Sequence, residues 1–225
     1  MTFHVLTLFP EVFEAGIHSV IKRGIQDGKI AINVVNIRDF AINCRGQTDG
    51  YPYGGGAGMI MMARPIYDAY KSLGAASGRV VYLSPQGRVF DQTTAAELSA
   101  EGELVLLCGH YEGVDQRIID EIVTDEISLG NFVLTGGEIA AMAVIDAVGR
   151  LVPGVIKPDS LMDESFSAGL LEYPQFTRPR TFMGRDVPEV LLSGHHGEVE
   201  KWRREKALEA TRSKRPDLLE GKGHG

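Results

Sequence analysis

The sequence predicts an α/β fold in which helices cover both faces of a mostly parallel sheet. Apolar, strand-like runs alternate with helical segments over about the first 150 residues, and several strand runs end in turns rich in glycine or proline. Strands separated by helices are joined by crossover connections, which make neighbouring strands parallel. A chain of 225 residues, 44% hydrophobic and 24% charged, is long enough for one such core and a small second module.

The expected elements alternate in a regular order. Strands are expected at residues 3–8, 30–37, 79–83 and 104–108. Helices are expected from Pro10, from 64 to 73, from the cap residue Asp91 to about 100, and from 116 to 122.

A block of apolar runs and glycine turns follows at residues 104–151. Its first strand ends in the sequence GHYEG, and a second extended run, 127–134, is broken by Gly130 and Asn131. Two strand ends that break into glycine can place bare backbone amides and carbonyls side by side. We therefore expect a pocket for a small polar cofactor at this point.

A strongly apolar helix is expected at 135–148. Thr135 and Glu138 have the spacing of a capping box, in which each side chain would bond to the backbone of the other residue.

The chain changes character after residue 152. Prolines at 153, 158, 174 and 179 interrupt any periodic pattern up to residue 182, which predicts a linker or an ordered functional loop. A charged helix is expected at 197–213, Pro216 starts a last short turn, and the terminal GKGHG is expected to be disordered.

The net charge of −7 is unevenly distributed. Residues 1–172 hold 12 Lys and Arg against 22 Asp and Glu, whereas residues 173–225 hold 11 against 8. An acidic body with a basic tail suggests that the tail meets a polyanion, although a solvated helix surface would give the same pattern.

The composition argues for a reduced, intracellular protein. No apolar run reaches the length of a membrane span, and the N-terminal segment lacks the pattern of a signal peptide. Cys44 and Cys108 show no metal-binding or redox spacing, so structural thiols in a cytoplasmic protein are expected.

Three short segments can be interpreted either as parts of a functional site or as ordinary structural features. The glycine loop YGGGAGM at 53–59 lacks the lysine of a phosphate-binding loop, so it indicates either a binding loop or a merely flexible one. The sequence LSPQG at 83–87 follows a strand, where ligands bind in open α/β sheets, but it also suits an ordinary turn. His110 follows the next strand and reads more readily as a loop histidine than as a base.

Two further positions suggest proton or anion chemistry. Arg150 ends the apolar helix, where it either complements the helix dipole or clamps an anion or carbonyl. Asp163 and Glu164 form a carboxylate pair that can accept a proton, although most such pairs are only solvated.

Taken together, the segments resemble one known family. In order they read YGGGAGM, YLSPQGR, CGHYEGVDQR, SLGNFVLTGGE, VGRLVPGV, ESFSAGLLEYPQFTRP and PEVLLSGHH. This series resembles the bacterial tRNA (guanine-N1)-methyltransferase family, TrmD, from Phe9 to about Leu219 and nearly without gaps.

The resemblance implies a fold and a reaction. The fold would be of the SPOUT type, with a deep C-terminal trefoil knot that sequence physics alone would not predict. The activity would be methyl transfer from S-adenosylmethionine to N1 of guanosine 37 in the anticodon stem-loop of tRNA, by an obligate homodimer that requires Mg²⁺ but shows no dedicated metal site. The implied parts are a knotted cofactor-binding domain at 1–157, a linker or active-site loop at 158–174, and a helical tRNA-binding domain at 175–225.

The family's cofactor-binding positions fall on strand ends and on the first residues of the expected apolar helix. They are Tyr82, Leu83, Ser84, Pro85, Gln86, Gly87, Gly109, Tyr111, Glu112, Gly113, Leu129, Gly130, Asn131, Phe132, Val133, Leu134, Thr135, Gly136 and Gly137.

By the same resemblance, Glu164 is the general base and Arg150 stabilises O6 of the guanine. The basic C-terminal helix would contact tRNA phosphates, and the sequence PQFTRP would stack on or clamp an extruded base. The substrate-binding positions would be Gly55, Gly56, Gly58, Ser165, Arg178 and Arg203.

Three positions depart from the family's usual pattern. Glu164 stands where Asp is usual, after a loop one residue shorter than in many relatives, which keeps Asp163 open as a substitute base. Asn131 stands where Asp is common, and Gly50 replaces the second acid before the glycine loop.

Three other functions remain open from the sequence. A ribose or ribosomal RNA methyltransferase of similar fold would not need the carboxylate at Glu164. A non-catalytic RNA-binding module would bind the cofactor without turnover. A nucleotide hydrolase is disfavoured because the glycine loop lacks a lysine.

Overall fold

The computed structural model describes residues 1–17, 19–74, 78–157, 160–161, 164–166 and 168–220. Asp163 and the terminal GKGHG, on which two of the expectations above fall, lie outside the described residues. The chain divides into two compact units, Met1–Ile156 and Lys157–Gly225.

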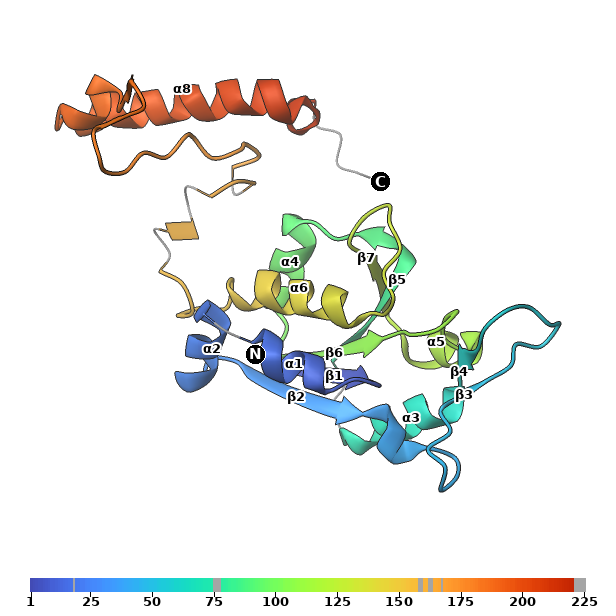
Figure 1. Cartoon of the computed structure of the whole chain (residues 1–225). Coiled ribbons are helices and arrows are strands. Elements are labelled where there is room, and N and C mark those ends of the chain that lie inside the picture. The colour runs from blue at the N-terminus through green and yellow to red at the C-terminus, as the bar shows by residue number, and fades with distance from the viewer. Residues whose placement is uncertain (18, 75–77, 158–159, 162–163, 167, 221–225) are drawn as a thin grey trace. The chain divides into compact units, whose positions relative to one another are not determined.

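A five-stranded sheet forms the centre of the first unit (Figure 1). Its strands are β1 (Thr2–Thr7), β2 (Ala31–Asn36), β5 (Arg79–Val89), β6 (Glu103–Cys108) and β7 (Asp125–Ser128). They lie in the order β2-β1-β6-β5-β7, and every neighbouring pair is parallel. The α/β class and the mostly parallel sheet predicted from the sequence are thus confirmed, whereas the trefoil knot stays a prediction.

Helices cover both faces of this sheet, as the alternating sequence predicted. One apolar core contains residues of α1 (Glu11–Gly16), α2 (Ser19–Gln26), α4 (Gln92–Ser99) and α6 (Glu138–Gly149). The other contains residues of the 3-10 helix η1 (Ile37–Phe40), α3 (Ala63–Ser72) and α5 (Gln116–Ile122).

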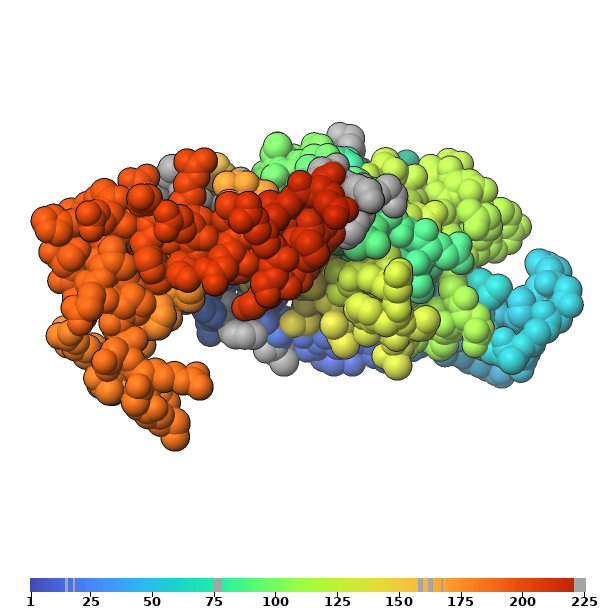
Figure 2. All heavy atoms as spheres, turned by 90° about the horizontal axis from the view of Figure 1, so that it is seen from above, coloured from blue at the N-terminus to red at the C-terminus, as the bar shows by residue number. Residues whose placement is uncertain are grey.

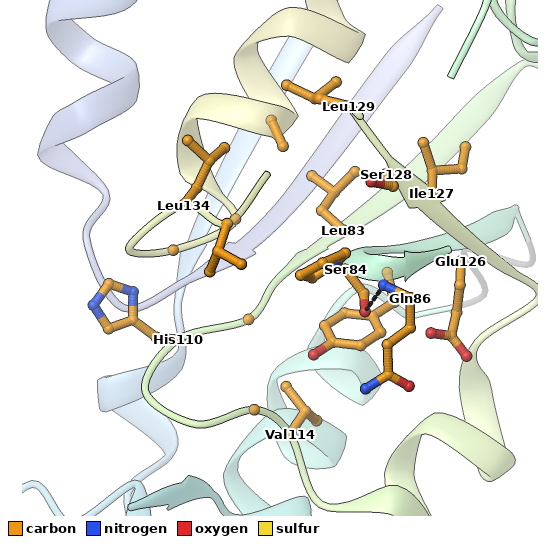
Figure 3. Close-up of a pocket in the computed structure, with 18 of the residues that line it drawn as sticks. Leu83, Ser84, Gln86, His110, Val114, Glu126, Ile127, Ser128, Leu129 and Leu134 are labelled. Carbon is orange, nitrogen blue, oxygen red and sulfur yellow. Dashed lines mark hydrogen bonds between the residues drawn. The ribbon is translucent and has the colours of Figure 1, made fainter. Parts of the chain in front are cut away.

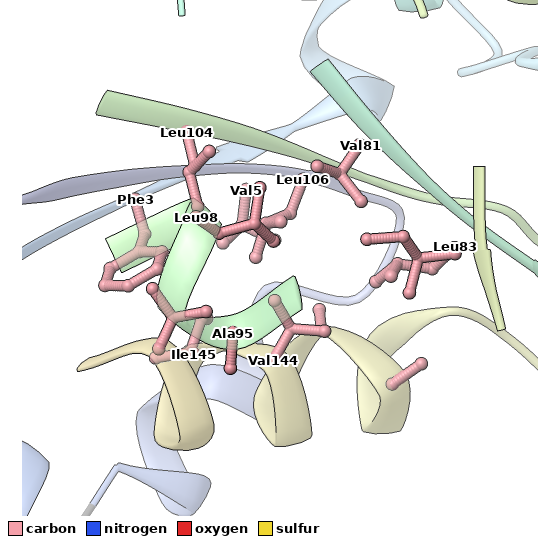
Figure 4. Packing of buried hydrophobic residues seen from close by; sticks show 14 of the residues in the cluster. Phe3, Val5, Val81, Leu83, Ala95, Leu98, Leu104, Leu106, Val144 and Ile145 are labelled. Atoms are coloured by element: carbon pink, nitrogen blue, oxygen red, sulfur yellow. The ribbon is translucent and has the colours of Figure 1, made fainter. Parts of the chain in front are cut away.

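Strand β6 shows why the sheet is buried on both faces. Leu104 and Leu106 lie in the first core, while Val105 and Leu107 lie in the second, and all four side chains are fully buried. Figure 4 shows Leu104 and Leu106 beside residues of neighbouring strands, above helices α4 and α6. Continuous apolar runs are typical of parallel strands, because both faces exclude water. Each such side chain contributes about 1.5–3 kcal/mol through burial.

Most expected elements occur close to their expected bounds. Pro10 precedes α1, and Asp91 caps α4 by accepting a hydrogen bond from the backbone N–H of Thr94 at 2.8 Å. The sequence did not predict α2, η1, or the short antiparallel pair β3 (Asp49–Gly50) and β4 (Ile60–Met61). The 3-10 helix and the two short strands contain too few residues to show a period, whereas α2 is amphipathic and was missed.

Two strand ends were predicted wrongly. Strand β5 does not stop at Leu83 but continues to Val89, because it pairs with β7 again at Arg88 after an irregularity. Strand β7 stops at Ser128 instead of running to Leu134. The Ser128 hydroxyl bonds to the backbone N–H and carbonyl of Gly130, which stabilises a turn at that point.

An ion pair fixes the beginning of β5 against that of β7. The Arg79 guanidinium donates to the Asp125 carboxylate, from Nε at 3.0 Å, and the Thr124 hydroxyl donates to the same carboxylate at 2.7 Å. Hydrogen bonding to Arg79 lowers the pKa of Asp125. The edge strand β7 is thereby held in register with the beginning of β5, ahead of the irregular stretch of β5 between Leu83 and Arg88.

The second unit is built around the long helix α8 (His196–Lys214), drawn in red in Figure 2. The helix expected at 197–213 is therefore confirmed, and Pro216 starts the short 3-10 helix η3 (Pro216–Leu219). The buried Thr211 hydroxyl donates to the carbonyl of Ala207 and accepts from the backbone N–H of Leu171 at 2.9 Å, which ties the preceding loop to the helix. The unit also contains a 3-10 helix η2 (Glu189–Leu192) and a two-stranded hairpin, β8 (Thr181–Phe182) and β9 (Arg185–Asp186), neither of which was predicted.

No helix in the described part of the chain is long and apolar enough to cross a membrane.

Replacing Gly87 by alanine should destabilise the protein. A Cβ atom at this position would lie 2.3 Å from backbone atoms of Glu126 and Ile127 in β7, and two backbones cannot separate without breaking the pairing. We expect the free energy of unfolding in urea to fall by about 1–3 kcal/mol. Gly102→Ala is the matched control, because a Cβ atom at Gly102 would have no other atom within 4 Å, and it should change stability by less than about 0.5 kcal/mol.

Candidate functional site

A cavity of about 330 Å³ lies at the carboxyl ends of β6 and β7, next to the irregular stretch of β5 and the beginning of α6 (Figure 3). Ligands bind at this edge in open α/β sheets, because loops diverge there and leave backbone groups unpaired. The volume falls at the lower end of the range for small-molecule sites.

The cavity brings together 16 of the 19 positions assigned to the cofactor by resemblance. The other three are Gly87, Gly130 and Asn131, which do not line it. The lining positions are Tyr82, Leu83, Ser84, Pro85, Gln86, Gly109, Tyr111, Glu112, Gly113, Leu129, Phe132, Val133, Leu134, Thr135, Gly136 and Gly137.

Eight further residues line the cavity and were not assigned to it from the sequence. They are His110, Val114, Gln116, Ile119, Glu126, Ile127, Ser128 and Ala140. Ile127 and Ser128 end β7, and Gln116 and Ile119 belong to α5. Their location at the end of a strand or on the next helix is the feature of the sequence that could have indicated a place in the cavity wall. His110 was interpreted as an ordinary loop histidine and was therefore not assigned, although Gly109 and Tyr111 on either side of it were.

Strand β5 contributes a polar wall. Figure 3 shows Ser84, Gln86 and Glu126 on the same side of the cavity, where the Ser84 hydroxyl accepts a hydrogen bond from the backbone N–H of Gln86 at 3.2 Å. Burial raises the pKa of Tyr82, so its phenol is protonated at neutral pH and can act as a hydrogen-bond donor. The wall therefore offers hydrogen bonds without a fixed positive charge.

The loop after β6 meets the glycine loop 53–59. The backbone N–H of Glu112 donates to the carbonyl of Met59 at 3.0 Å, and that of Met61 donates to Gly113 at 2.9 Å. A Cβ atom at Gly58 would lie 2.4 Å from Cγ of Glu112, and Gly58 has a φ of +81°. Gly58 is thus required where the loop contacts the cavity wall. Of the two interpretations of the glycine loop, as a binding loop or as a merely flexible one, these contacts favour a structured loop next to the cavity.

Glu138 does not cap its helix, contrary to the capping-box prediction. Helix α6 begins at Glu138 itself, its N-cap is Gly137, and no side chain caps it. Because the helix starts three residues later than expected, Glu138 points into the protein. Its Oε1 accepts a hydrogen bond of 2.8 Å from the Thr7 hydroxyl at the end of β1, and only 5% of Glu138 and none of Thr7 is exposed.

This buried pair links the end of β1 to two segments that line the cavity, the loop after β6 and the start of α6. The Thr7 hydroxyl also accepts from the backbone N–H of Phe9 at 2.9 Å, and Oε2 of Glu138 lies 3.7 Å from Nδ1 of His110. The backbone N–H of Gly137 donates to the carbonyl of Gly109 at 2.8 Å. The end of β1, the loop after β6 and the start of α6 are therefore held together by polar contacts.

The cysteines have no catalytic environment. Both thiols are free, and Cys108 is fully buried. Burial, assisted by the nearby Glu138, raises the pKa of the Cys108 thiol well above its usual value, so it stays protonated and unreactive. The structural interpretation of Cys108 is consistent with this environment.

The two residues assigned to catalysis belong to different compact units. Arg150 caps the C-terminus of α6 in the first unit, and its backbone N–H donates to the carbonyl of Asp146 at 3.1 Å. Glu164 lies half-buried in the second unit, next to Ser165, whose hydroxyl accepts from the backbone N–H of Glu172 at 3.0 Å.

Of the remaining assigned positions, three are exposed and Arg203 is partly buried. Gly55 and Gly56 lie in the exposed glycine loop, and Arg178 is exposed in the second unit. The Arg203 guanidinium lies 4.8 Å from the ring centre of Tyr173, in a cation–π contact. No group of three His, Cys, Asp or Glu residues in the described ranges is arranged to hold a metal ion.

Comparison with known proteins gives a consistent result. Residues 1–221 match the family model described as tRNA (Guanine-1)-methyltransferase TrmD. A tRNA (guanine-N(1)-)-methyltransferase of Exiguobacterium sibiricum is 58% identical over 221 residues, covering 98% of this chain and 91% of the relative. Proteins of the same name from Alkaliphilus oremlandii and Clostridioides difficile are 54% and 50% identical, covering 97% of this chain and 92% and 97% of the relatives.

The Thr7–Glu138 contact predicts a measurable loss of stability. Thr7→Val keeps the shape of the side chain but leaves the buried Glu138 carboxylate without its donor, so the free energy of unfolding should fall by about 1–3 kcal/mol. Thr48→Val is the control: Thr48 is equally buried, and its hydroxyl has no hydrogen-bond partner within the described residues. That change should be neutral or stabilising in urea unfolding, and equal losses in the two variants would contradict the argument.

Proposed function

This chain belongs to the tRNA (guanine-1)-methyltransferase TrmD family, and we propose that it transfers a methyl group from S-adenosylmethionine to N1 of guanosine 37 in tRNA. The observation that carries the proposal is the family match over residues 1–221, which includes the whole cavity and both residues assigned to catalysis.

The cavity residues suit S-adenosylmethionine as the cofactor. Adenine, ribose and an amino acid group bond well to backbone amides and carbonyls, and the segments 82–86, 109–113 and 129–137 contribute most of the cavity wall. The carboxylates of Glu112 and Glu126 also line it, which suits a ligand with a positively charged sulfur. When bound, S-adenosylmethionine supplies a methyl group activated by that charge.

Guanine N1 carries a proton and is a poor nucleophile until the proton leaves. We assign its removal to the Glu164 carboxylate. The freed electron pair on N1 then forms the new N–C bond as the S–C bond breaks, which leaves N1-methylguanosine, S-adenosylhomocysteine and a proton on Glu164.

Loss of the N1 proton places negative charge on O6 of the guanine. We assign the stabilisation of this charge to the Arg150 guanidinium, whose position at the end of the rigid helix α6 limits its freedom. Because Glu164 and Arg150 belong to different units, the reaction requires both units of the chain.

We assign the binding of tRNA to the second unit. Helix α8 exposes Lys201, Arg204 and Lys214, which can contact phosphates without reading the base sequence. The Tyr173–Arg203 contact and the Phe176–Trp202 ring pair, with centroids 6.2 Å apart, provide flat surfaces next to the PQFTRP segment.

The family resemblance carries three further proposals. We propose that the enzyme is an obligate homodimer, that it acts in the cytoplasm on its tRNA substrate, and that its activity requires Mg²⁺. No step is assigned to Mg²⁺, because no cluster of ligands for it occurs among the described residues.

A transfer assay tests the reaction. Labelled S-adenosylmethionine is incubated with unmodified tRNA transcripts that carry either guanosine or adenosine at position 37, with Mg²⁺ present or chelated. We expect labelled N1-methylguanosine only in the guanosine transcript, and its loss on chelation. Methylated ribose would instead indicate a 2′-hydroxyl methyltransferase, and cofactor binding without transfer would indicate a non-catalytic RNA-binding protein.

Two substitutions test the assigned roles. Glu164→Gln should lower kcat by about 10²–10⁴-fold, because the amide cannot accept the proton, while the affinity for S-adenosylhomocysteine stays near that of the wild type. Arg150→Ala should lower kcat more than it weakens cofactor binding. If Glu164→Gln stays active and Asp163→Asn is inactive, Asp163 is the base; if Arg150→Ala loses only affinity, its O6 role is wrong.

A further inference from the structure

We infer that the hairpin formed by β8 and β9 is an RNA-binding arm that contacts the tRNA with an exposed aromatic and arginine surface. The inference rests on the proposed function and adds a contact surface to it. The arm is defined here as residues 174–186.

The arm has no buried side. Every residue from 174 to 186 is exposed, including Phe182 with 65% and Met183 with 87% of its surface accessible. A two-stranded hairpin without a packed face is only marginally stable in water. No packing contact within the described residues therefore accounts for the apolar side chains of Phe182 and Met183 at the tip.

Met183 occupies a turn position whose backbone conformation is unfavourable for methionine. Met183 and Gly184 connect the strands with φ values of +50° and +74°, as in the two-residue turns that favour Asn-Gly or Asp-Gly. Methionine is strained in this left-handed conformation, whereas asparagine would be less strained and more soluble. An exposed, strained apolar side chain at a turn points to a contact with another molecule.

The charge around the tip favours a polyanion. The arm contains Arg178, Arg180 and Arg185 against the single acid Asp186, in a chain whose net charge is −7. Arg180 is paired with Glu189, whereas Arg178 and Arg185 form no ion pair with any residue that the structure describes. Asp186 accepts a hydrogen bond from the Thr181 hydroxyl, and its one negative charge does not balance the three arginines.

The register places an aromatic ring next to one of these arginines. Phe182 and Arg185 are directly opposite each other across the two strands, so their side chains leave the same face of the hairpin. A ring that stacks on a base next to a guanidinium that binds phosphate is a common arrangement for unpaired RNA. A partner protein would not require this concentration of positive charge.

Binding of full-length protein to an unmodified tRNA transcript tests the inference, by fluorescence anisotropy over a range of salt concentrations. Phe182→Ala should weaken binding roughly 5- to 100-fold, the range expected for one stacked base. Arg185→Gln should reduce the salt dependence by the equivalent of about one phosphate contact. Ile42→Ala, which truncates a similarly exposed side chain in the first unit, is the matched control and should bind as the wild type does.

Met183→Asn separates a binding role from a structural one. Asparagine relieves the strain of the turn, so the melting temperature should stay unchanged or rise, while the affinity for tRNA should fall by at least a few-fold. The KM for tRNA should rise in both tip variants, with kcat at saturating tRNA within two-fold of the wild type.

The outcomes are distinct. If the wild type binds and methylates tRNA but Phe182→Ala and Met183→Asn bind it equally well, the inference is wrong and the proposed function stands; the apolar tip then belongs to a protein contact. If the wild type itself binds no tRNA, the proposed function and the inference both fail.

Discussion

The buried hydrogen bond between Thr7 and Glu138 joins parts of the chain that are 131 residues apart, and the cavity depends on it. A carboxylate that is 5% exposed is stable only when it is bonded, so Glu138 holds β1 and α6 together as a condition of folding. The loop after β6 is then fixed between them, with His110 beside Glu138 and Gly109 bonded to Gly137. Two of the segments that line the cavity are thus connected to the core of the first unit.

The cavity wall consists largely of backbone and uncharged side chains, which explains why no phosphate-binding motif occurs in the sequence. Close approach of segments decides its shape: Gly87 lies against β7, and Gly58 lies against Glu112. A side chain at Gly87 would push β5 and β7 apart, because the close atoms there are backbone atoms. At Gly58 the close atoms belong to the exposed side chain of Glu112, so its φ of +81° is the stronger reason for glycine.

The two units divide the work in the proposed reaction. The cofactor cavity and Arg150 belong to the first unit, whereas Glu164, the basic helix α8 and the hairpin arm belong to the second. The charge follows this division only in part, because residues 1–156 hold 11 Lys and Arg against 18 Asp and Glu, whereas residues 157–225 hold 12 of each. A fully exposed hairpin that carries Phe182, Met183 and Arg185 is consistent with a unit whose surface is completed by RNA.

The sequence by itself determined the α/β class, the parallel sheet, most helices and the two glycine-rich strand ends, because period and turn chemistry are local properties. Family motifs also selected most of the cavity positions. Only the tertiary structure decided where β5 and β7 end, because pairing between strands distant in sequence overrides a Ser-Pro turn signal at Ser84. It likewise turned Glu138 from an expected cap into a buried partner of Thr7, since a side chain's partner depends on which segments meet in space.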